Sequence, residues 1–354
     1  MSAGQEDTMA ASASPDLTAS AETIEFTRET FVFDGLSLFY VLDDRYAERC
    51  LEGGVNAANI TFAAEAENWD ETLRRIDEGL EKIARSPYLM LATCHADLLR
   101  ARAAGKLAAI VGTQGASMLD GQPKRVRILH RLGMRFFGLA YTGANLFADG
   151  CGELRDAGVS YLGRDLIEEV NALNLILDLS HCGHRTRNEA TALATHPVCT
   201  HSNAYAINPN DRNTRDETAV AIAGKGGVIG VCGLPRSVWP SNTPTLAQLL
   251  DHLDHYMRLI GGEHVGFGFD FVEGYVEAAQ AGTSQHKPPK WRTLRPDIFG
   301  TVADFFADTY PLGMHSIRLL PNFTQGLFDR GYTKAQASAI LGGNWLRKFR
   351  ETAG

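Results

Sequence analysis

A single (β/α)8 barrel is the architecture expected for this chain of 354 residues, for two reasons. First, short and almost continuously apolar runs alternate with longer amphipathic stretches, as parallel strands do when helices cover both faces of their sheet. Second, eight such alternations follow one another, which is the number that closes a barrel of the usual size. A doubly wound open sheet has the same order of elements. No glycine-rich phosphate loop follows the first apolar run, however, which disfavours that alternative.

The expected strands are the apolar runs at residues 31–38, 55–62, 107–114, 134–141, 174–181, 197–203, 227–233 and 264–270. Helical periodicity predicts helices at residues 70–85, 160–173, 245–260 and 333–350. Residues 1–25 are rich in Ala, Ser, Thr and acidic side chains, and we expect a disordered tail there, ahead of the barrel at residues 26–354. Residues 273–296 are expected to form a long loop over the mouth of the barrel.

Composition and charge disfavour several kinds of partner. A net charge of -8 without clusters of Lys or Arg argues against a nucleic-acid surface. No apolar run reaches the roughly 20 residues that a membrane span requires. The six cysteines lie far apart, as reduced thiols do, and the first 25 residues lack the basic start and apolar segment of a secretory signal. We therefore expect a cytoplasmic protein that acts on a small molecule, without a membrane or nucleic-acid partner.

Polar side chains close several of the expected strands. Gln114, Tyr141, His181, His201 and Asp270 each stand at the end of an apolar run. The C-terminal ends of barrel strands face the active site, and neutral imidazoles are good zinc ligands. His181 and His201, which close two successive strands, are therefore predicted to share a metal site. Taken singly, each residue also has an ordinary explanation, such as a buried histidine bonded to a carbonyl or a capped core tyrosine.

Six segments in the chain carry a family pattern: Phe33-Asp34-Gly35, Asp178-Leu179-Ser180-His181, His201-Ser202, and residues 212–217, 266–271 and 342–347. Together they resemble the membrane dipeptidase family of zinc metallopeptidases, over residues 30 to 350. The resemblance implies a barrel enzyme with two zinc ions bridged by a glutamate, and a homodimer. It also implies that a bridging hydroxide attacks the dipeptide carbonyl, that an aspartate on the last strand moves the proton, and that an arginine binds the substrate carboxylate.

Four positions of this pattern are retained. By resemblance, His181 and His201 match the ligands of the second ion, Asp270 matches the proton-moving aspartate, and Arg212 matches the carboxylate-binding arginine. An ion pair between Arg212 and Asp216 would explain this arginine equally well.

Two further residues are candidates for the same pocket. Tyr141 offers a phenol that could polarise a carbonyl, as a catalytic or substrate-binding group. Asn145, a few residues further along the chain, is a candidate for substrate binding.

The ligands of the first ion are substituted. Where the family has Asp-Gly-His-x-Asp, this chain reads Asp34-Gly35-Leu36-Ser37-Leu38; the bridging glutamate is Gln114, and Leu-Thr-His reads Leu139-Ala140-Tyr141. An amide oxygen lacks the negative charge that holds two dications together. We expect Leu36 and Leu38 to fill the volume of the missing ion. One zinc ion, held by His181, His201 and Gln114, is therefore predicted, with Asp270 as general base and then general acid.

Two functions of different classes remain open. The first is a one-zinc hydrolase or lyase that acts on a small amide, a dipeptide or another amino-acid-derived metabolite. The second is a metal-free homologue that binds a small molecule, serves as a subunit of another enzyme or catalyses a non-peptidase reaction. The retained polar residues favour the first function, and the loss of the first ion's ligands favours the second.

Overall fold

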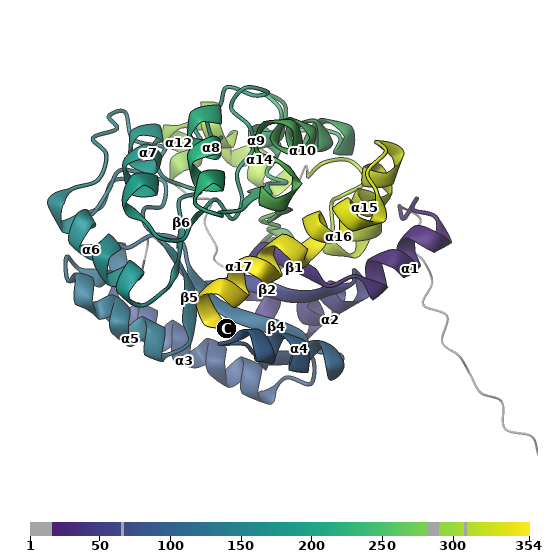
Figure 1. Cartoon of the computed structure of the whole chain (residues 1–354), viewed down its shortest axis with the longest axis horizontal. Helices are drawn as coiled ribbons and strands as arrows, with labels where there is room; N and C mark the ends of the chain where they lie inside the picture. The colour runs from purple at the N-terminus through teal and green to yellow at the C-terminus, as the bar shows by residue number, and fades with distance from the viewer. Residues whose placement is uncertain (1–15, 65–66, 282–289, 308–309) are drawn as a thin grey trace, which may run out of the picture.

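The computed structural model describes residues 16–64, 67–281, 290–307 and 310–354, and Figure 1 shows helices arranged around a central curved sheet. The strands are β1 (Val32–Leu38), β2 (Val55–Ala63), β3 (Leu89–Leu91), β4 (Leu107–Thr113), β5 (Met134–Gly138), β6 (Ile176–Asp178), β7 (Pro197–Val198), β8 (Ile229–Val231) and β9 (Val265–Phe267). The helices are α1 (Ala21–Glu29), α2 (Asp44–Glu52), α3 (Trp69–Arg85), α4 (His95–Ala103), α5 (Val126–Arg131), α6 (Tyr161–Ala172), α7 (His184–Leu193), α8 (Asp216–Gly224), α9 (Pro235–Val238), α10 (Leu246–Ile260), α11 (Glu273–Gln280), α12 (Trp291–Leu294), α13 (Pro296–Phe299), α14 (Val302–Ala307), α15 (Leu320–Asp329), α16 (Lys334–Ser338) and α17 (Asn344–Ala353).

Parallel strands form the wall of a barrel. One sheet runs β1-β2-β4-β5-β6-β7, and β8 pairs with β9. A parallel bridge between Cys199 and Ile229 joins the two sheets, and the Asp270 amide donates to the Leu36 carbonyl at 3.4 Å, which connects the end of β9 to β1. These eight strands coincide with the eight expected runs, so the barrel prediction is confirmed. The short strand β3, which the sequence does not predict, pairs with the first half of β4, below the stretch that pairs with β5.

The four expected helices are present as α3, α6, α10 and the pair α16 and α17. Capping boxes begin three of them, at Asn68 for α3, at Thr245 for α10 and at Thr333 for α16. The expected helix at residues 333–350 is interrupted by a π-helical turn, Ala339–Gly343. A Cβ atom on Gly342 would lie 2.2 Å from the Phe31 carbonyl oxygen, so only glycine allows this turn to pack so closely against β1. No helix in the described part of the chain is long and apolar enough to cross a bilayer.

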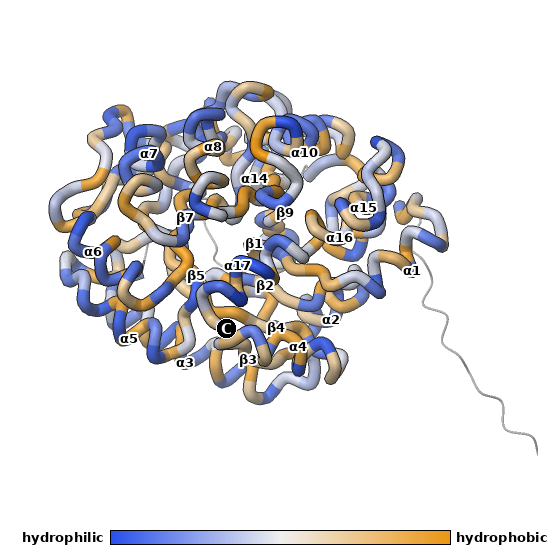
Figure 2. Tube along the Cα trace, viewed as in Figure 1, coloured by the Kyte–Doolittle hydropathy of each residue, from blue (hydrophilic) through white to orange (hydrophobic). Residues whose placement is uncertain are grey.

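Aromatic rings fill one end of the barrel. Phe33 of β1 and Phe136 of β5 lie 6.3 Å apart between ring centroids, and Trp345 and Phe349 of α17 pack against both of them. All four side chains are buried in one cluster, and α17 lies across the centre of the sheet in Figure 1. In Figure 2 hydrophobic and hydrophilic residues alternate along the outer helices, as in helices that pack one face on a core. Because this end is filled, a site can open only at the C-terminal ends of the strands.

Residues 16–25 are more ordered than the sequence suggests. Of the tail expected at residues 1–25, residues 1–15 lie outside the described residues, but residues 21–25 belong to α1. Ser20 caps this helix by accepting from the Thr23 amide at 3.1 Å. The Asn322 side chain of α15 accepts from the amides of Thr18 and Ala19, at 2.8 and 3.0 Å. The expected boundary at residue 25 therefore needs correction, because contacts from the other end of the chain hold this segment.

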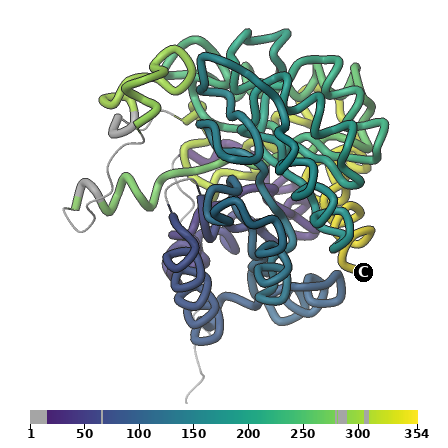
Figure 3. Tube along the Cα trace, turned by 90° about the vertical axis from the view of Figure 1, so that its left-hand side faces the viewer, coloured from purple at the N-terminus to yellow at the C-terminus, as the bar shows by residue number. Residues whose placement is uncertain are grey.

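The expected loop at residues 273–296 contains helices as well. α11 follows β9 closely, and Arg49 of α2 holds it through Glu273 at 3.2 Å and Glu277 at 2.7 Å. Residues 282–289 lie outside the described residues. The next helix, α12, buries Trp291 in a small cluster with Cys151, Ile298 and Phe299. Figure 3 shows this part of the chain, in light green, beside the teal segments that follow β5. The described parts of this segment are thus helices, where an open loop is expected.

Candidate active site

Two histidines meet at the C-terminal ends of β6 and β7. His181 lies three residues beyond the end of β6, and His201 three residues beyond the end of β7. Their Nε2 atoms are 3.1 Å apart, and their ring centroids are 5.0 Å apart. Both side chains are buried. The structure therefore brings the two histidines that the sequence predicts as metal ligands to one point, nitrogen facing nitrogen.

A short relay of hydrogen bonds fixes the ring of His201. The Thr200 hydroxyl donates to Asp178 Oδ2 at 2.6 Å, and its oxygen lies 2.7 Å from His201 Nδ1. Because the hydroxyl has a single proton, which goes to Asp178, its oxygen accepts the Nδ1 proton of His201. Asp178 is itself held by the amides of Ser180 and Thr200, both at 3.0 Å. This network assigns a lone pair to His201 Nε2, directed at His181.

His181 is held by two residues that follow β5. The Tyr141 ring stacks on it with centroids 4.1 Å apart, and Thr142 Oγ1 lies 3.3 Å from its Nδ1 atom. Burial, and then the positive charge of Arg212, hold the pKa of both His181 and His201 well below the ordinary 6.5. Both rings are therefore neutral at physiological pH, which is the form that binds metals.

Arg212 is a buried cation beside this pair. Its Nη1 atom donates to the Ser180 carbonyl, and its backbone amide donates to Asn210 Oδ1 at 2.9 Å. Its Nε and Nη2 atoms are buried and have no hydrogen-bond partner among the residues that the structure describes. Asp216, the partner that the sequence offers as an alternative, bonds to His255 at 2.8 Å. A buried guanidinium with unused donors is suited to bind an anionic group.

Asp270 lies just beyond β9 with a φ of +59°, a left-handed conformation that costs an aspartate about 1–3 kcal/mol. The Tyr310 hydroxyl donates to its carbonyl oxygen, and its amide donates to Leu36. Burial raises the pKa of Asp270 to about 7, although the charges of Arg212 and Arg292 lower it in part. A carboxyl that titrates near neutrality can take up and release a proton at physiological pH.

Two other predicted residues, Gln114 and Asn145, lie near strand ends, and their side-chain amides form hydrogen bonds. The side-chain nitrogen of Gln114, just after β4, donates to Thr61 Oγ1 at 2.7 Å, so its carbonyl oxygen is the group able to bind a cation. The Asn145 side chain donates to the Leu139 carbonyl at 3.0 Å and accepts from the Phe147 amide at 2.8 Å. These bonds organise the loop after β5. The roles of Gln114 as a metal ligand and of Asn145 in substrate binding stay predictions.

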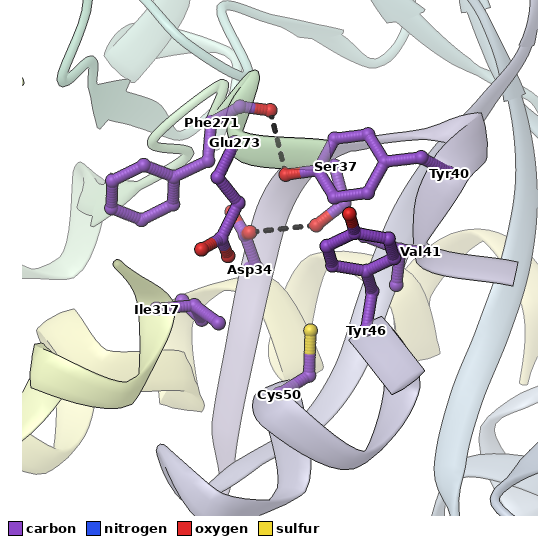
Figure 4. Close-up of a pocket in the computed structure, with 9 residues that line it drawn as sticks. All are labelled: Asp34, Ser37, Tyr40, Val41, Tyr46, Cys50, Phe271, Glu273 and Ile317. Atoms are coloured by element: carbon purple, nitrogen blue, oxygen red, sulfur yellow. Dashed lines mark hydrogen bonds between the residues drawn. The ribbon is translucent and has the colours of Figure 1, made fainter. Parts of the chain in front are cut away.

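The segment that would hold the first ion is Asp34-Gly35-Leu36-Ser37-Leu38, in β1. A bulge between Asp34 and Ser37 interrupts the pairing of β1 with β2. Figure 4 shows them in a pocket with Cys50 of α2. Asp34 accepts from the Ser37 hydroxyl at 2.8 Å and from the Leu36 amide at 3.1 Å. Burial raises the pKa of Asp34 to about 7. The carboxyl of Asp34 is thus bonded to Ser37 and Leu36 of its own strand and to the backbone of Phe269.

The donor set does not fit a two-ion centre. In the described residues, which include every predicted ligand, no three His, Cys, Asp or Glu side chains come together to hold a metal. The lone pair of His201 and the facing nitrogen of His181 repel each other unless a proton or a cation lies between them. A tetrahedral zinc ion with bonds of about 2.1 Å would separate them by about 3.4 Å, close to the observed 3.1 Å. The pair thus offers two nitrogen donors that could bind one cation.

Sequence reasoning misses two groups of this site. Thr200 stands directly before His201, and its relay to Asp178 could be suspected from polar residues inside otherwise apolar strands. Arg292 acts on Asp270 from α12, in a segment that the sequence predicts as a loop. Nothing in the sequence marks Arg292, because only the packing of α12 brings it to the barrel mouth.

Comparison with known proteins supports this architecture. A model of the family described as membrane dipeptidase (Peptidase family M19) matches residues 41–285. The crystal structure of an amidohydrolase from Pseudomonas aeruginosa is similar, with 26% identity and a TM-score of 0.82 over 94% of this chain and 99% of that one. A metallopeptidase from Rhodobacter sphaeroides, solved with a phosphinate mimic of L-Ala-D-Ala, shares the fold at 20% identity, with a TM-score of 0.73 over 91% of this chain and 99% of that one.

Two curated relatives match a smaller part of this chain. Dipeptidase tcpJ from Claviceps purpurea is 28% identical over 262 residues, which are 72% of this chain and 53% of the relative. An uncharacterized dipeptidase from Schizosaccharomyces pombe is 32% identical over 210 residues, which are 57% of this chain and 50% of the relative. The chain spans about half the length of these relatives. Because the family model covers more than half of the chain, and the barrel agrees with it, this chain belongs to the membrane dipeptidase family, Peptidase family M19.

Proposed function

We propose that this protein is a dipeptidase-like hydrolase that uses one zinc ion, rather than two, to cleave a small amide such as a dipeptide or another amino-acid-derived metabolite. The observation that carries the proposal is the facing pair of neutral nitrogens of His181 and His201. A buried arginine with unused donors acts on both histidines, and its charge also acts on a carboxyl that titrates near pH 7. Perturbed groups that converge at a barrel mouth are typical of catalysis.

The side chains of the site divide the chemistry among them. Zinc bound at the histidine pair would supply a water of lowered pKa and polarise the carbonyl. Asp270 takes up the proton of the water that adds to the amide carbon, and gives it to the nitrogen as the C–N bond breaks. Arg212 binds the substrate carboxylate through Nε and Nη2. Tyr141, stacked on His181, donates its phenol proton toward the carbonyl oxygen.

A second candidate function is a metal-free homologue that binds a carboxylated metabolite or catalyses a non-peptidase reaction. One observation favours it: within residues 16–354, apart from the undescribed gaps, His181 and His201 have no third His, Cys, Asp or Glu close enough to complete a metal site. Two imidazoles with neutral oxygens bind zinc more weakly than imidazoles with a carboxylate. The two candidates differ in whether chelation of the metal changes activity.

Metal-dependent hydrolysis tests the proposal directly. Chelator-treated protein is titrated with zinc and assayed on dipeptides, N-acyl amino acids and small quaternary-amine metabolites. Hydrolysis that chelation abolishes and one equivalent of zinc restores would support the one-ion hydrolase. Turnover that survives chelation would contradict it, and binding of carboxylated ligands without turnover would favour the second candidate. The cytoplasmic location and the homodimer remain part of the proposal, and light scattering in solution tests the latter.

A further inference from the structure

Arg187 of α7 is a fully buried cation that contacts two segments of the candidate active site. Its Nε atom donates to the Leu179 carbonyl at 3.2 Å, and its Nη2 atom donates to the Ser180 carbonyl at 2.8 Å. Nη2 also donates to the Arg212 carbonyl at 2.8 Å, and Nη1 donates to the Asn213 carbonyl at 2.6 Å. All four acceptors are backbone oxygens. Because a buried charge is costly unless it is hydrogen-bonded, these bonds hold the main chain firmly around Arg187.

These bonds join the strand end that carries a predicted metal ligand to the loop that carries the predicted carboxylate-binding group. Leu179 and Ser180 directly precede His181, after β6, whereas the other two acceptors are Arg212 and the residue that follows it, after β7. A planar guanidinium presents its donors in a rigid fork, so it fixes the spacing of the carbonyls that it bridges. Arg187 therefore determines how far the Arg212 backbone lies from His181.

The two buried guanidiniums meet at one carbonyl oxygen. Arg212 Nη1 donates to the Ser180 carbonyl, which also accepts from Arg187 Nη2. The Nε and Nη2 atoms of Arg212 are buried and have no hydrogen-bond partner in the described part of the chain. Two like charges this close repel each other, and a bound anion offsets the repulsion. The unused donors of Arg212 and the charges of both guanidiniums thus favour a carboxylate at this point.

We propose that Arg187 is a positioning residue, which holds the Arg212 guanidinium at the distance from His181 that a substrate carboxylate requires and thereby favours substrates with a free carboxylate over neutral ones. The inference rests on the proposed function, because it takes Arg212 as the group that binds the carboxylate. All three nitrogens of Arg187 bond to backbone carbonyls, so it acts on the substrate through Arg212 and not by contact.

A double-mutant cycle in equilibrium binding tests this dependence. The ligands are racemic N-acetylalanine and its amide, which differ in the charge of the terminal group, and isothermal titration calorimetry gives the affinity of each. The wild-type protein should bind the carboxylate on the order of 10- to 100-fold more tightly, as expected for hydrogen bonds to a charged group. Arg187→Met should remove most of this preference and leave the affinity for the amide unchanged. In an Arg212→Met background, Arg187→Met should have no further effect, because the group that it positions is gone.

A merely structural role would give a different result. Arg187→Met would then weaken both ligands alike, or would weaken the carboxylate equally with and without Arg212, and either result would overturn the inference. Equal affinities in the wild-type protein, or binding of neither ligand at millimolar concentration, would overturn it as well. The matched control is Arg185→Met, which removes an exposed arginine of the same helix that pairs with Glu189 at 2.8 Å. This control should keep the wild-type preference.

Arg187→Lys covers the case in which Arg187→Met does not fold. It keeps a buried positive charge but replaces the fork by a single ammonium group, so it should also lose most of the preference. A lysine variant with the full wild-type preference would show that charge suffices, and would overturn the positioning role. Hydrolysis of N-acetylalanine and of Ala-Ala is followed in parallel. A preference that depends on Arg187 through Arg212, without hydrolysis of either compound, would refute the proposed function but support the role of Arg187.

Discussion

His181 and His201 present their Nε2 atoms to each other at 3.1 Å, and the ring of His201 is fixed from behind by the Thr200 hydroxyl. Two neutral imidazoles at this distance share either a proton or a cation. The surrounding residues do not repeat the family's two-ion centre, because its first-ion positions hold apolar or amide side chains. A cation between these two nitrogens would indicate a one-ion hydrolase. A proton between them would indicate a metal-free homologue.

Replacing one histidine of the pair should remove metal and activity together. His181→Ala leaves a single imidazole, which cannot hold zinc against water. We expect zinc content and hydrolysis to fall in parallel, measured by elemental analysis and by a dipeptide assay on the same sample. His130→Ala, in α5 away from the pair, should change neither quantity. A variant at position 181 that keeps its zinc would show that this residue is not a ligand.

The relay behind His201 should set zinc affinity. Thr200→Val keeps the shape of the side chain but removes the hydroxyl that accepts from His201 Nδ1. Loss of the hydrogen-bond partner of a metal-binding histidine typically lowers metal affinity about 10- to 100-fold. Competition with a chromophoric chelator measures the change, and Thr200→Ser should restore the wild-type value. If Thr200→Val binds zinc as well as the wild-type protein, the relay has no role in metal binding.

Asp270→Asn should separate metal binding from catalysis. The amide keeps the size of the side chain but cannot carry a proton between water and the leaving nitrogen. Turnover should drop about 10²- to 10⁴-fold, the usual contribution of a general acid-base group, while the zinc content stays that of the wild-type protein. Asp165→Asn, on the exposed face of α6, controls for the loss of a surface carboxylate. Zinc lost along with turnover would make Asp270 a ligand instead.

Activity should fall as the pH drops below about 7. The ionised form of Asp270 is the one that accepts a proton, and burial raises its pKa to about 7. The acidic limb of kcat/KM should therefore lie near pH 7, well above the ordinary range of an aspartate. His181 and His201 lose their protons at lower pH, so they do not produce this limb. A pH profile of Asp270→Asn that keeps the same limb would assign it to another group.

The free energy of unfolding of Asp34→Asn, relative to that of the wild-type protein, should increase as the pH rises. The folded-state pKa of Asp34, about 7, is above its ordinary 3.8, so the folded protein binds more protons between these values. The contribution of this carboxyl to the free energy of unfolding therefore falls from about pH 4 to about pH 7. Urea titrations at pH 5 and pH 8 should show the variant gaining relative to the wild-type protein. A difference that is constant with pH, or equal to that of the exposed control Asp77→Asn, would contradict this.

The barrel could be predicted because the buried strands are apolar on both faces and each is separated from the next by a helix. The eight wall strands agree with that pattern, whereas β3 and α1 do not follow from it. β3 is three residues long and exists because it pairs with β4. α1 is held by Gln325, about 300 residues away, and local composition contains no sign of such a contact.

The site was predictable where strand ends determine it. The ends of β6 and β7 bring His181 and His201 together, and the end of β5 places Tyr141 on one of these rings. Arg292 reaches the mouth only through the packing of α12, so no strand rule finds it. The side chain of Asn145 bonds to Leu139 and Phe147 of its own loop, and strand ends alone do not predict these bonds.

The zinc content of the purified protein, measured by elemental analysis after dialysis against metal-free buffer, tests the central claim most directly. One zinc ion per chain is predicted, bound at His181 and His201 and absent from His181→Ala. Two ions per chain would contradict this, because Leu36, Leu38 and Gln114 offer no charged ligand for a second ion. No zinc in a protein that still turns over its substrate would contradict it as well, and would favour the metal-free homologue.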